Sequence, residues 1–178
     1  MNIVLIGYRC SGKTSSGKII AKKTGRGFID TDAMIEERAG RPIEEVIAVK
    51  GWEYFRGLEK EVIEDISGMD NLVIATGGGV VIDEDNVVNL KKNGFVVWLK
   101  AGIDILKERM ERDEVSGIPR PSLTGMDTMD EVETVLASRN PLYKKAGDLV
   151  IETDKISIRE VANLIIKEAL SRLHRARS

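Results

Sequence analysis

Residues 7–14 read Gly7-Tyr8-Arg9-Cys10-Ser11-Gly12-Lys13-Thr14 and match the pattern G-x4-G-K-[ST]. This stretch directly follows an apolar run, residues 2–6, and a helix-compatible segment begins at Ser15. In a phosphate-binding loop (P-loop), a strand aims the loop, its backbone N–H groups turn inward, and the next helix points its positive end at the same phosphate oxygens. The context therefore favours a P-loop over an ordinary strand-to-helix turn. We expect residues 7–15 to bind a nucleotide, with the Lys13 ammonium on its phosphates and the Thr14 hydroxyl on Mg²⁺.

Composition limits the class of protein and its partners. The 178 residues are 42% hydrophobic and only 4% aromatic, which predicts one domain with an aliphatic core. With 29 acidic and 27 basic residues the net charge is −2, which argues against a nucleic acid as partner. Cys10 is the only cysteine, so an internal disulfide is excluded and a reducing, cytoplasmic location is expected. We expect a monomer.

The available side chains narrow the chemistry. The P-loop begins too early for a cleavable signal peptide to precede it, and no apolar run is long enough for a membrane span, so no membrane association is expected. The only histidine, His174, lies in a basic tail, residues 172–178, that we expect to be frayed. Catalysis must therefore come from Asp, Glu, Lys, Arg and backbone groups.

Short apolar runs alternate with amphipathic segments along the chain. This alternation predicts an α/β fold in which parallel strands are joined by crossover helices. Three insertions interrupt the rhythm. Residues 31–67 are expected to hold a substrate, and residues 113–127, rich in Gly, Pro, Ser and Thr, are expected to form a mobile lid. The third insertion is the glycine run, residues 77–79. The five predicted strands are residues 2–6, 27–30, 72–75, 95–99 and 149–152.

Two aspartates follow the second predicted strand. On extended backbone the i, i+2 spacing of Asp30 and Asp32 places both side chains on one face, at the sheet edge where ligands gather. One carboxylate could hold Mg²⁺ and the other could orient or deprotonate a substrate hydroxyl. In many P-loop proteins the acidic residue that holds Mg²⁺ stands at the end of a strand beside the P-loop. The third predicted strand ends in glycines and offers no carboxylate there, so Asp30 is the nearest candidate for the metal. The alternatives are a helix N-cap for Asp32 and a turn residue for Asp30.

Three consecutive glycines, Gly77, Gly78 and Gly79, follow the third predicted strand. Such a run suits either a tight turn with positive φ or the close approach of a ligand to peptide N–H groups. A turn alone rarely needs three glycines, so the run favours a ligand.

Four arginines are candidates for binding anions. Arg56 and Glu59 are spaced i, i+3, which fits a surface ion pair as well as a carboxylate that fixes a guanidinium for a substrate carboxylate. Arg139 has the same ambiguity. Arg120 lies between two prolines in the predicted lid and suits closure over a transferring phosphoryl group. Arg109 could stack on a base, although a solvated helix face is the commoner arrangement for such a sequence.

Six segments occur in an order that resembles the motif set of the shikimate kinases, and the resemblance covers roughly residues 2–170. They are Gly7 to Thr14, Asp30-Thr31-Asp32, Phe55-Arg56 with Glu59, Gly77-Gly78-Gly79, Arg120-Pro121-Ser122-Leu123, and Arg139-Asn140-Pro141-Leu142-Tyr143.

The resemblance implies a three-layer P-loop kinase fold with five parallel strands in the order 2-3-1-4-5. It further implies that Thr14 and Asp30 serve Mg²⁺ and that Asp32 binds ring hydroxyls and acts as a base. For shikimate, the resemblance implies that Arg56 and Arg139 clamp the carboxylate and that Gly78 and Gly79 line the same pocket. For ATP, it implies that Arg109 packs against adenine and that Arg120 closes with the lid. The chain departs from the pattern at Cys10, where the family usually has glycine, and at Trp52, where glutamate is more usual.

The leading hypothesis is ATP-dependent phosphorylation of the 3-hydroxyl of shikimate. The alternatives are another small-molecule kinase of this fold, for gluconate or a nucleotide, and a regulatory module that binds ATP without turnover. Two arginines beside a hydroxyl-binding aspartate suit a hydroxy acid better than a nucleobase. Retention of Lys13, Thr14, both aspartates and Arg120 argues against a module without activity.

Overall fold

The computed structural model of the protein describes residues 1–115 and 131–175. Four of the five strands match the predicted runs residue for residue. The exception is the fourth strand along the chain, which is one residue longer at each end than its predicted run. The strands are β1 (Asn2–Ile6), β2 (Gly27–Asp30), β3 (Leu72–Ala75), β4 (Gly94–Lys100) and β5 (Leu149–Glu152).

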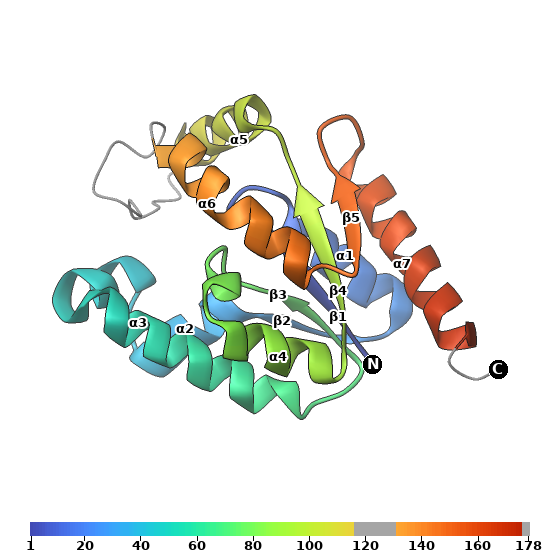
Figure 1. Ribbon diagram of the computed structural model, residues 1–178, viewed down its shortest axis with the longest axis horizontal. Helices are drawn as coiled ribbons and strands as arrows, with labels where there is room; N and C mark the ends of the chain where they lie inside the picture. The colour runs from blue at the N-terminus through green and yellow to red at the C-terminus, as the bar shows by residue number, and fades with distance from the viewer. Residues whose placement is uncertain (116–130, 176–178) are drawn as a thin grey trace.

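Helices occupy the segments between the strands, and one more helix follows the last strand (Figure 1). They are α1 (Lys13–Thr24), α2 (Thr31–Ala39), α3 (Ile43–Ser67), the 3-10 helix η1 (Val80–Ile82), α4 (Glu84–Lys92), α5 (Ile103–Val115), α6 (Glu131–Ala146) and α7 (Ile158–Arg175).

The strands form one sheet in the order β2-β3-β1-β4-β5, and every neighbouring pair is parallel. This confirms the strand order and the three-layer P-loop kinase fold. The central strand β1 pairs with β3 on one side and β4 on the other, where Leu5 lies opposite Ala75 and Val97. Because all strands are parallel, the P-loop after β1, Asp30 at the end of β2 and the glycines after β3 lie at one edge of the sheet.

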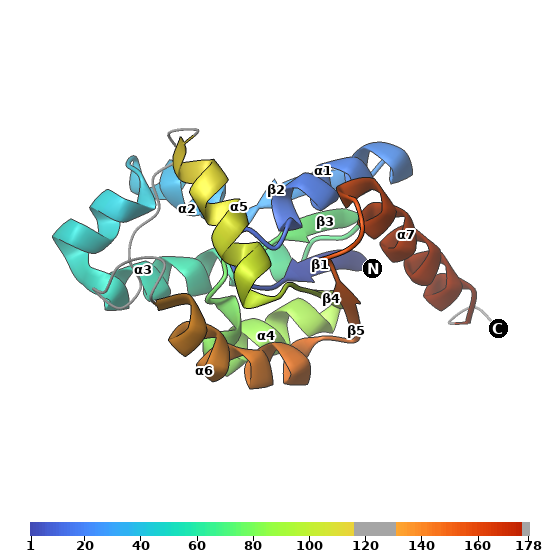
Figure 2. The same cartoon turned by 90° about the horizontal axis from the view of Figure 1, so that it is seen from above.

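Both faces of the sheet are covered, so its strands are apolar on both sides (Figure 2). Ile3 and Leu5 of β1 face the core under α1 and α7, whereas Val4 and Ile6 face the core under α3, α4 and α6. Residues that alternate in β1 therefore belong to two different clusters, as the period of a strand requires.

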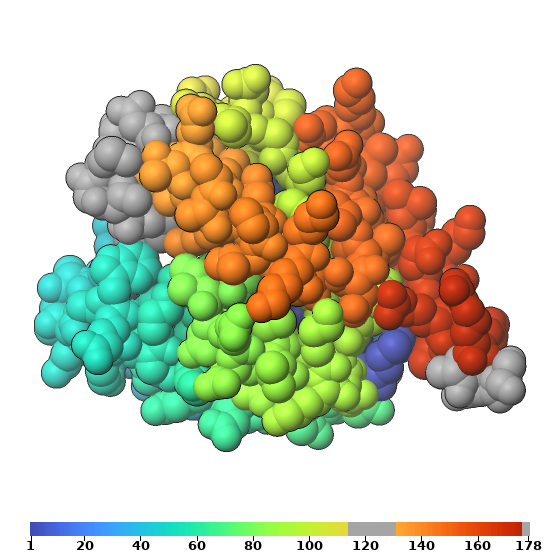
Figure 3. Space-filling model, viewed as in Figure 1, coloured from blue at the N-terminus to red at the C-terminus, as the bar shows by residue number. Residues whose placement is uncertain are grey.

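The start of α3 projects beyond the end of the sheet (Figure 1; cyan in Figure 3), whereas the end of α3 packs beside α4 on one face of the sheet. Helix α2 packs on α3. The two helices have an apolar cluster of their own, built around Ile35, Val46, Phe55 and Val62. Gly51 interrupts α3 with φ 83° and ψ 171°, a backbone conformation that a side chain would oppose. The helix that carries Trp52 to Ser67 therefore starts anew after this kink.

Part of the tail prediction is wrong, because α7 extends to Arg175 and so includes residues 172–175. Of the predicted lid, only residues 113–115 are described, and they belong to α5.

No helix within the described ranges is both long and apolar enough to cross a membrane.

Candidate active site

The P-loop follows a path that depends on left-handed backbone. Gly7 has φ 141° and Gly12 has φ 98°, and a Cβ at Gly7 would lie 2.4 Å from the Leu99 carbonyl oxygen. Cys10 also has a positive φ, 60°, which is uncommon for a residue with a side chain. The loop thus keeps at Cys10 a conformation that glycine adopts without strain.

Buried polar groups of the loop mark a site for an anion. The Lys13 ammonium donates to the carbonyls of Gly7 and Tyr8, at 2.8 Å each. The hydroxyls of Ser11 and Ser16 are buried, and neither has a hydrogen-bond partner among the described residues. Leaving such groups unpaired is costly, so a ligand with acceptor oxygens would stabilise this region.

Two cavities meet at this edge of the sheet. The P-loop pocket, about 380 Å³, is lined by the P-loop, by Arg109 of α5 and by residues near the start of α7. The α3 pocket, about 530 Å³, is lined by α2, α3, the glycine run and Arg139. The residues that line both pockets are Arg9, Thr14, Asp30, Asp32 and Gly78. A group transferred from one pocket to the other would pass these shared residues.

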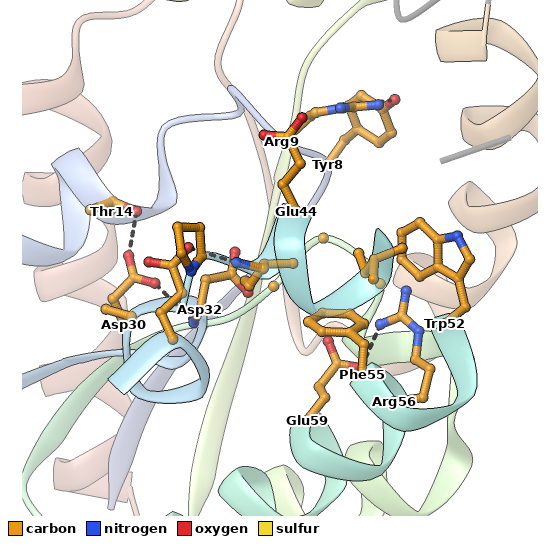
Figure 4. A pocket seen from close by; sticks show the side chains of 18 of the residues that line it. Tyr8, Arg9, Thr14, Asp30, Asp32, Glu44, Trp52, Phe55, Arg56 and Glu59 are labelled. Carbon is orange, nitrogen blue, oxygen red and sulfur yellow. Dashed lines mark hydrogen bonds and ion pairs between the residues drawn. The ribbon is translucent and has the colours of Figure 1, made fainter. Parts of the chain in front are cut away.

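Thr14 and Asp30 are placed to share a cation. The Thr14 Oγ1 atom donates to Asp30 Oδ2 at 2.8 Å across the boundary of the pockets (Figure 4). Mg²⁺ in kinase sites takes one or two protein oxygens and fills its remaining positions with water and phosphate oxygens. The described residues contain no group of three or more His, Cys, Asp or Glu side chains that could hold a metal by themselves. The donor set therefore fits Mg²⁺ delivered with a nucleotide.

The expected geometry of the two aspartates is wrong in one respect. Only Asp30 is on extended backbone, because the helix α2 begins at Thr31 and includes Asp32. Asp30 is also the N-cap of α2, since its Oδ1 accepts from the Asp32 N–H at 3.2 Å. The cap proposed for Asp32 therefore belongs to Asp30. Both carboxylates still line both pockets.

The environment of Asp32 suits a proton acceptor. Burial, followed by the nearby charge of Asp30, raises the pKa of Asp32 from 3.8 to about 6, while Lys13 opposes the shift. A base is most effective when its pKa lies near the working pH.

The same shift predicts an effect on stability. Because the folded state binds the Asp32 proton more tightly than the unfolded state, protonation favours folding between the two pKa values, 3.8 and about 6. Above that window the ionised carboxylate costs stability. We expect Asp32→Asn to raise Tm at pH 7.5, with the difference from wild type shrinking toward pH 4, in thermal melts followed by circular dichroism. Glu37→Gln, the same change at an exposed position of α2, is the control; an Asp32→Asn variant that is less stable at both pH values would contradict the prediction.

The glycine run is explained by side chains of the site. The left-handed residues of the described chain do not include Gly77, Gly78 or Gly79, so the positive-φ turn is wrong. A Cβ at Gly77 would lie 2.7 Å from Asp32 Oδ1, and one at Gly79 would lie 2.2 Å from Arg56 Nη2. Glycine is needed here because Asp32 and Arg56 approach the backbone closely, and the run also lines the α3 pocket.

Arg56 and Glu59 form a pair that is largely buried, not a surface ion pair. Arg56 Nη1 lies 2.5 Å from Glu59 Oε2, and the Glu59 side chain is fully buried. Burial raises the pKa of Glu59, whereas Arg56 lowers it. The Oε1 atom of Glu59 has no hydrogen-bond partner among the described residues. Glu59 therefore fixes one edge of the guanidinium, and Arg56 lines the α3 pocket.

Arg139 reaches the same pocket from α6. Its Nη1 atom donates to the Gly78 carbonyl at 3.1 Å, and the Tyr143 hydroxyl donates to the same oxygen. Burial raises the pKa of Tyr143 far above its ordinary value, so its hydroxyl stays protonated and remains a donor. Sequence reasoning assigned no role to Tyr143, although it lies one helical turn after Arg139. Two buried residues of α6 thus hold the middle glycine.

Arg109 is not on a solvated helix face. Its guanidinium donates to the Cys10 carbonyl at 3.2 Å and to the Thr153 carbonyl at 2.9 Å, so it joins the P-loop to the end of β5. Thr153, a buried residue that the sequence did not single out, also lines the P-loop pocket. The remaining candidate, Arg120, lies outside the described residues.

The parallel sheet, the P-loop and a second pocket across Thr14, Asp30 and Asp32 define a P-loop phosphotransferase. A family model described as shikimate kinase matches residues 9–170. A shikimate kinase of Thermodesulfovibrio yellowstonii is 41% identical over 167 residues, covering 94% of each chain. One of Syntrophus aciditrophicus is 39% identical over 174 residues, covering 93% of this chain and 89% of the relative. The chain belongs to the shikimate kinase family.

Solved structures agree with this assignment. Shikimate kinase from Acinetobacter baumannii in complex with shikimate has a TM-score of 0.88 and 33% identity, covering 96% of this chain and 93% of that one. Shikimate kinase from Aquifex aeolicus has a TM-score of 0.81 and 29% identity, covering 97% and 98%.

Proposed function

We propose that this protein transfers the γ-phosphoryl group of ATP to the 3-hydroxyl of shikimate, giving shikimate 3-phosphate and ADP. The observation that carries the proposal is the shared wall of the two pockets, where Thr14, Asp30 and Asp32 stand between the P-loop and the pocket that Arg56 and Arg139 line. The family and a relative solved in complex with shikimate support the choice of acceptor. The nucleotide would occupy the P-loop pocket and shikimate the α3 pocket.

Each residue then has a defined task. Lys13 and the P-loop N–H groups bind the phosphates, Arg109 lies against the base, and Arg56 and Arg139 bind the shikimate carboxylate. Asp32 binds the ring hydroxyls and accepts the proton of the attacking one. Mg²⁺, held through Thr14 and Asp30, would supply charge neutralisation at the phosphates. We assign to Arg120, which lies outside the described residues, a contact with the transferring phosphoryl group. We assign to Gly77, Gly78 and Gly79 the backbone wall beside the substrate.

An ADP-release assay coupled to a second enzyme tests the assignment. Shikimate, quinate, gluconate and nucleoside monophosphates are each offered with ATP and Mg²⁺. ADP release that depends on shikimate alone supports the proposal. Release with gluconate or a nucleotide instead would indicate another small-molecule kinase, and nucleotide binding without turnover of any acceptor would indicate a regulatory module.

We further propose that the protein is a monomer that works in the cytoplasm and binds neither nucleic acid nor membrane. Size-exclusion chromatography with light scattering tests whether it is a monomer.

Loss of Arg56 or Arg139 from the α3 pocket is expected to raise KM for shikimate while kcat changes little. The carboxylate lies away from the reacting hydroxyl, so its binding energy is nearly equal in the ground and transition states. We expect Arg56→Met or Arg139→Met to raise KM about 10- to 100-fold, since a hydrogen bond to a charged group contributes about 1.5–3 kcal/mol.

Steady-state kinetics and calorimetry check this expectation. Arg38→Met, which removes an arginine of α2 that pairs with Asp65 outside both pockets, is the matched control. Equal weakening of ATP and shikimate binding by the pocket variants would argue against a carboxylate clamp.

A further inference from the structure

The Arg56 guanidinium lies in a cradle built mostly from one face of α3. Trp52, Phe55, Arg56 and Glu59 follow each other at i, i+3, i+4 and i+7, so their side chains lie on the same side of the helix (Figure 4). This segment begins directly after the kink at Gly51, so the kink sets where its first side chain, Trp52, is presented.

Two aromatic rings form a corner around the cation. The Trp52 and Phe55 rings meet edge to face, with centroids 5.7 Å apart and planes at 83°. The Arg56 Cζ atom lies 5.6 Å from the Trp52 centroid and 4.9 Å from the Phe55 centroid. Both distances are within the range over which a ring attracts a cation.

The other two sides of the cradle are polar and steric. Glu59 Oε2 lies 2.5 Å from Nη1, and the backbone at Gly79 comes so close that a Cβ there would lie 2.2 Å from Nη2. Only 25% of the Arg56 side chain remains exposed, and both Arg56 and Trp52 line the α3 pocket. Holding a flexible side chain in place before the ligand arrives removes an entropy cost from binding.

We propose that Trp52 is a positioning residue: its ring holds the Arg56 guanidinium in the orientation that receives a carboxylate, and so sets the preference for an acid over a neutral cyclic polyol. The proposal rests on the proposed function, in which Arg56 binds the carboxylate of shikimate. It differs from direct contact of the Trp52 ring with the carbon ring of the substrate, because direct contact would affect charged and neutral substrates equally.

The test compares shikimate with its primary amide, which has nearly the same shape but no charge. We expect Trp52→Leu to lower the ratio of kcat/KM for shikimate to kcat/KM for the amide by about 3- to 10-fold, the range that a partly exposed cation–π contact implies. The kcat for shikimate should stay within about twofold of wild type, because the effect is on binding. Tyr54→Leu, which removes an exposed aromatic ring of the same helix outside both pockets, is the control and should leave the ratio unchanged.

A double-mutant cycle separates action through Arg56 from other roles. In an Arg56→Met background, Trp52→Leu should cause no further loss for shikimate, because the group that it positions is gone. A loss that persists in this background, or an equal loss for the amide, would overturn the proposal in favour of direct contact. An unchanged ratio in folded Trp52→Leu would overturn it outright.

A measurement without substrate keeps the two hypotheses distinguishable. The Nε–H signal of Arg56 in ¹⁵N-labelled wild-type protein, assigned with Arg56→Met, should be shifted by the ring and should move toward its ordinary position in Trp52→Leu. If wild type fails to phosphorylate shikimate, the proposed function is wrong, while this signal still decides whether Trp52 positions Arg56. If Trp52→Leu is unfolded in a thermal melt, Trp52→Met, a longer and more flexible apolar replacement, undergoes the same comparisons. An unmoved Nε–H signal in either folded variant refutes the cradle.

Discussion

Replacing Asp32 by alanine is expected to lower kcat for shikimate phosphorylation by about 100-fold or more, the loss typical of removing a positioned acid–base group. Asp32 lies at the boundary of the two pockets, and its raised pKa, about 6, makes it a proton acceptor near neutral pH. If it acts as a base, Asp32→Asn should be as slow as the alanine variant, because the amide can orient a hydroxyl but cannot take its proton. The measurement is kcat at saturating ATP and shikimate.

The pH profile gives an independent check of the same role. In wild type, kcat/KM should rise as pH increases through about 6, where Asp32 loses its proton. The rise should be absent from the residual activity of Asp32→Asn. Glu37→Gln, an exposed change on the same helix, should keep the wild-type rate and profile. If the Asp32→Asn variant phosphorylates shikimate at nearly the wild-type rate, Asp32 only orients the hydroxyl.

The expected gain in stability from Asp32→Asn has the opposite sign to its expected effect on rate. Both follow from one cause, since burial raises the energy of the carboxylate and thereby makes it a better base. A residue kept for packing or solubility would not show both effects.

The strands and the P-loop could be predicted because they depend on local patterns. Apolar runs bounded by polar segments mark the strands, and Gly7 and Gly12 mark places where the backbone must be left-handed. The order of the strands came only from the resemblance to a family, because which strands pair depends on contacts between distant segments.

The contacts inside the site were predictable only in part. The i, i+2 argument for Asp30 and Asp32 assumed extended backbone, but the chain turns into helix at Thr31, where the Asp30 side chain caps it. Gly79 is required by Arg56, and Arg109 binds the Cys10 carbonyl 99 residues away. Such requirements arise from tertiary packing, and no local pattern records them.

Lys13→Ala is expected to be nearly inactive, with kcat lowered by about 100- to 1,000-fold, as when one preorganised charge-stabilising group is removed. The Lys13 ammonium is nearly buried and is held by the Gly7 and Tyr8 carbonyls. It lines the P-loop pocket, where we propose that the phosphates bind.

The same two hydrogen bonds give Lys13 a second role, in the conformation of the empty loop. Hydrogen exchange of residues 7–12 should therefore become faster in Lys13→Ala without nucleotide, while exchange in β4 stays unchanged. Lys18→Ala, an exposed lysine of the same helix, is the control for loss of charge on α1. If exchange is faster but activity is unchanged, Lys13 stabilises the conformation of the loop and does not contribute to catalysis. Lost activity with unchanged exchange would place its whole contribution in the complex with ATP.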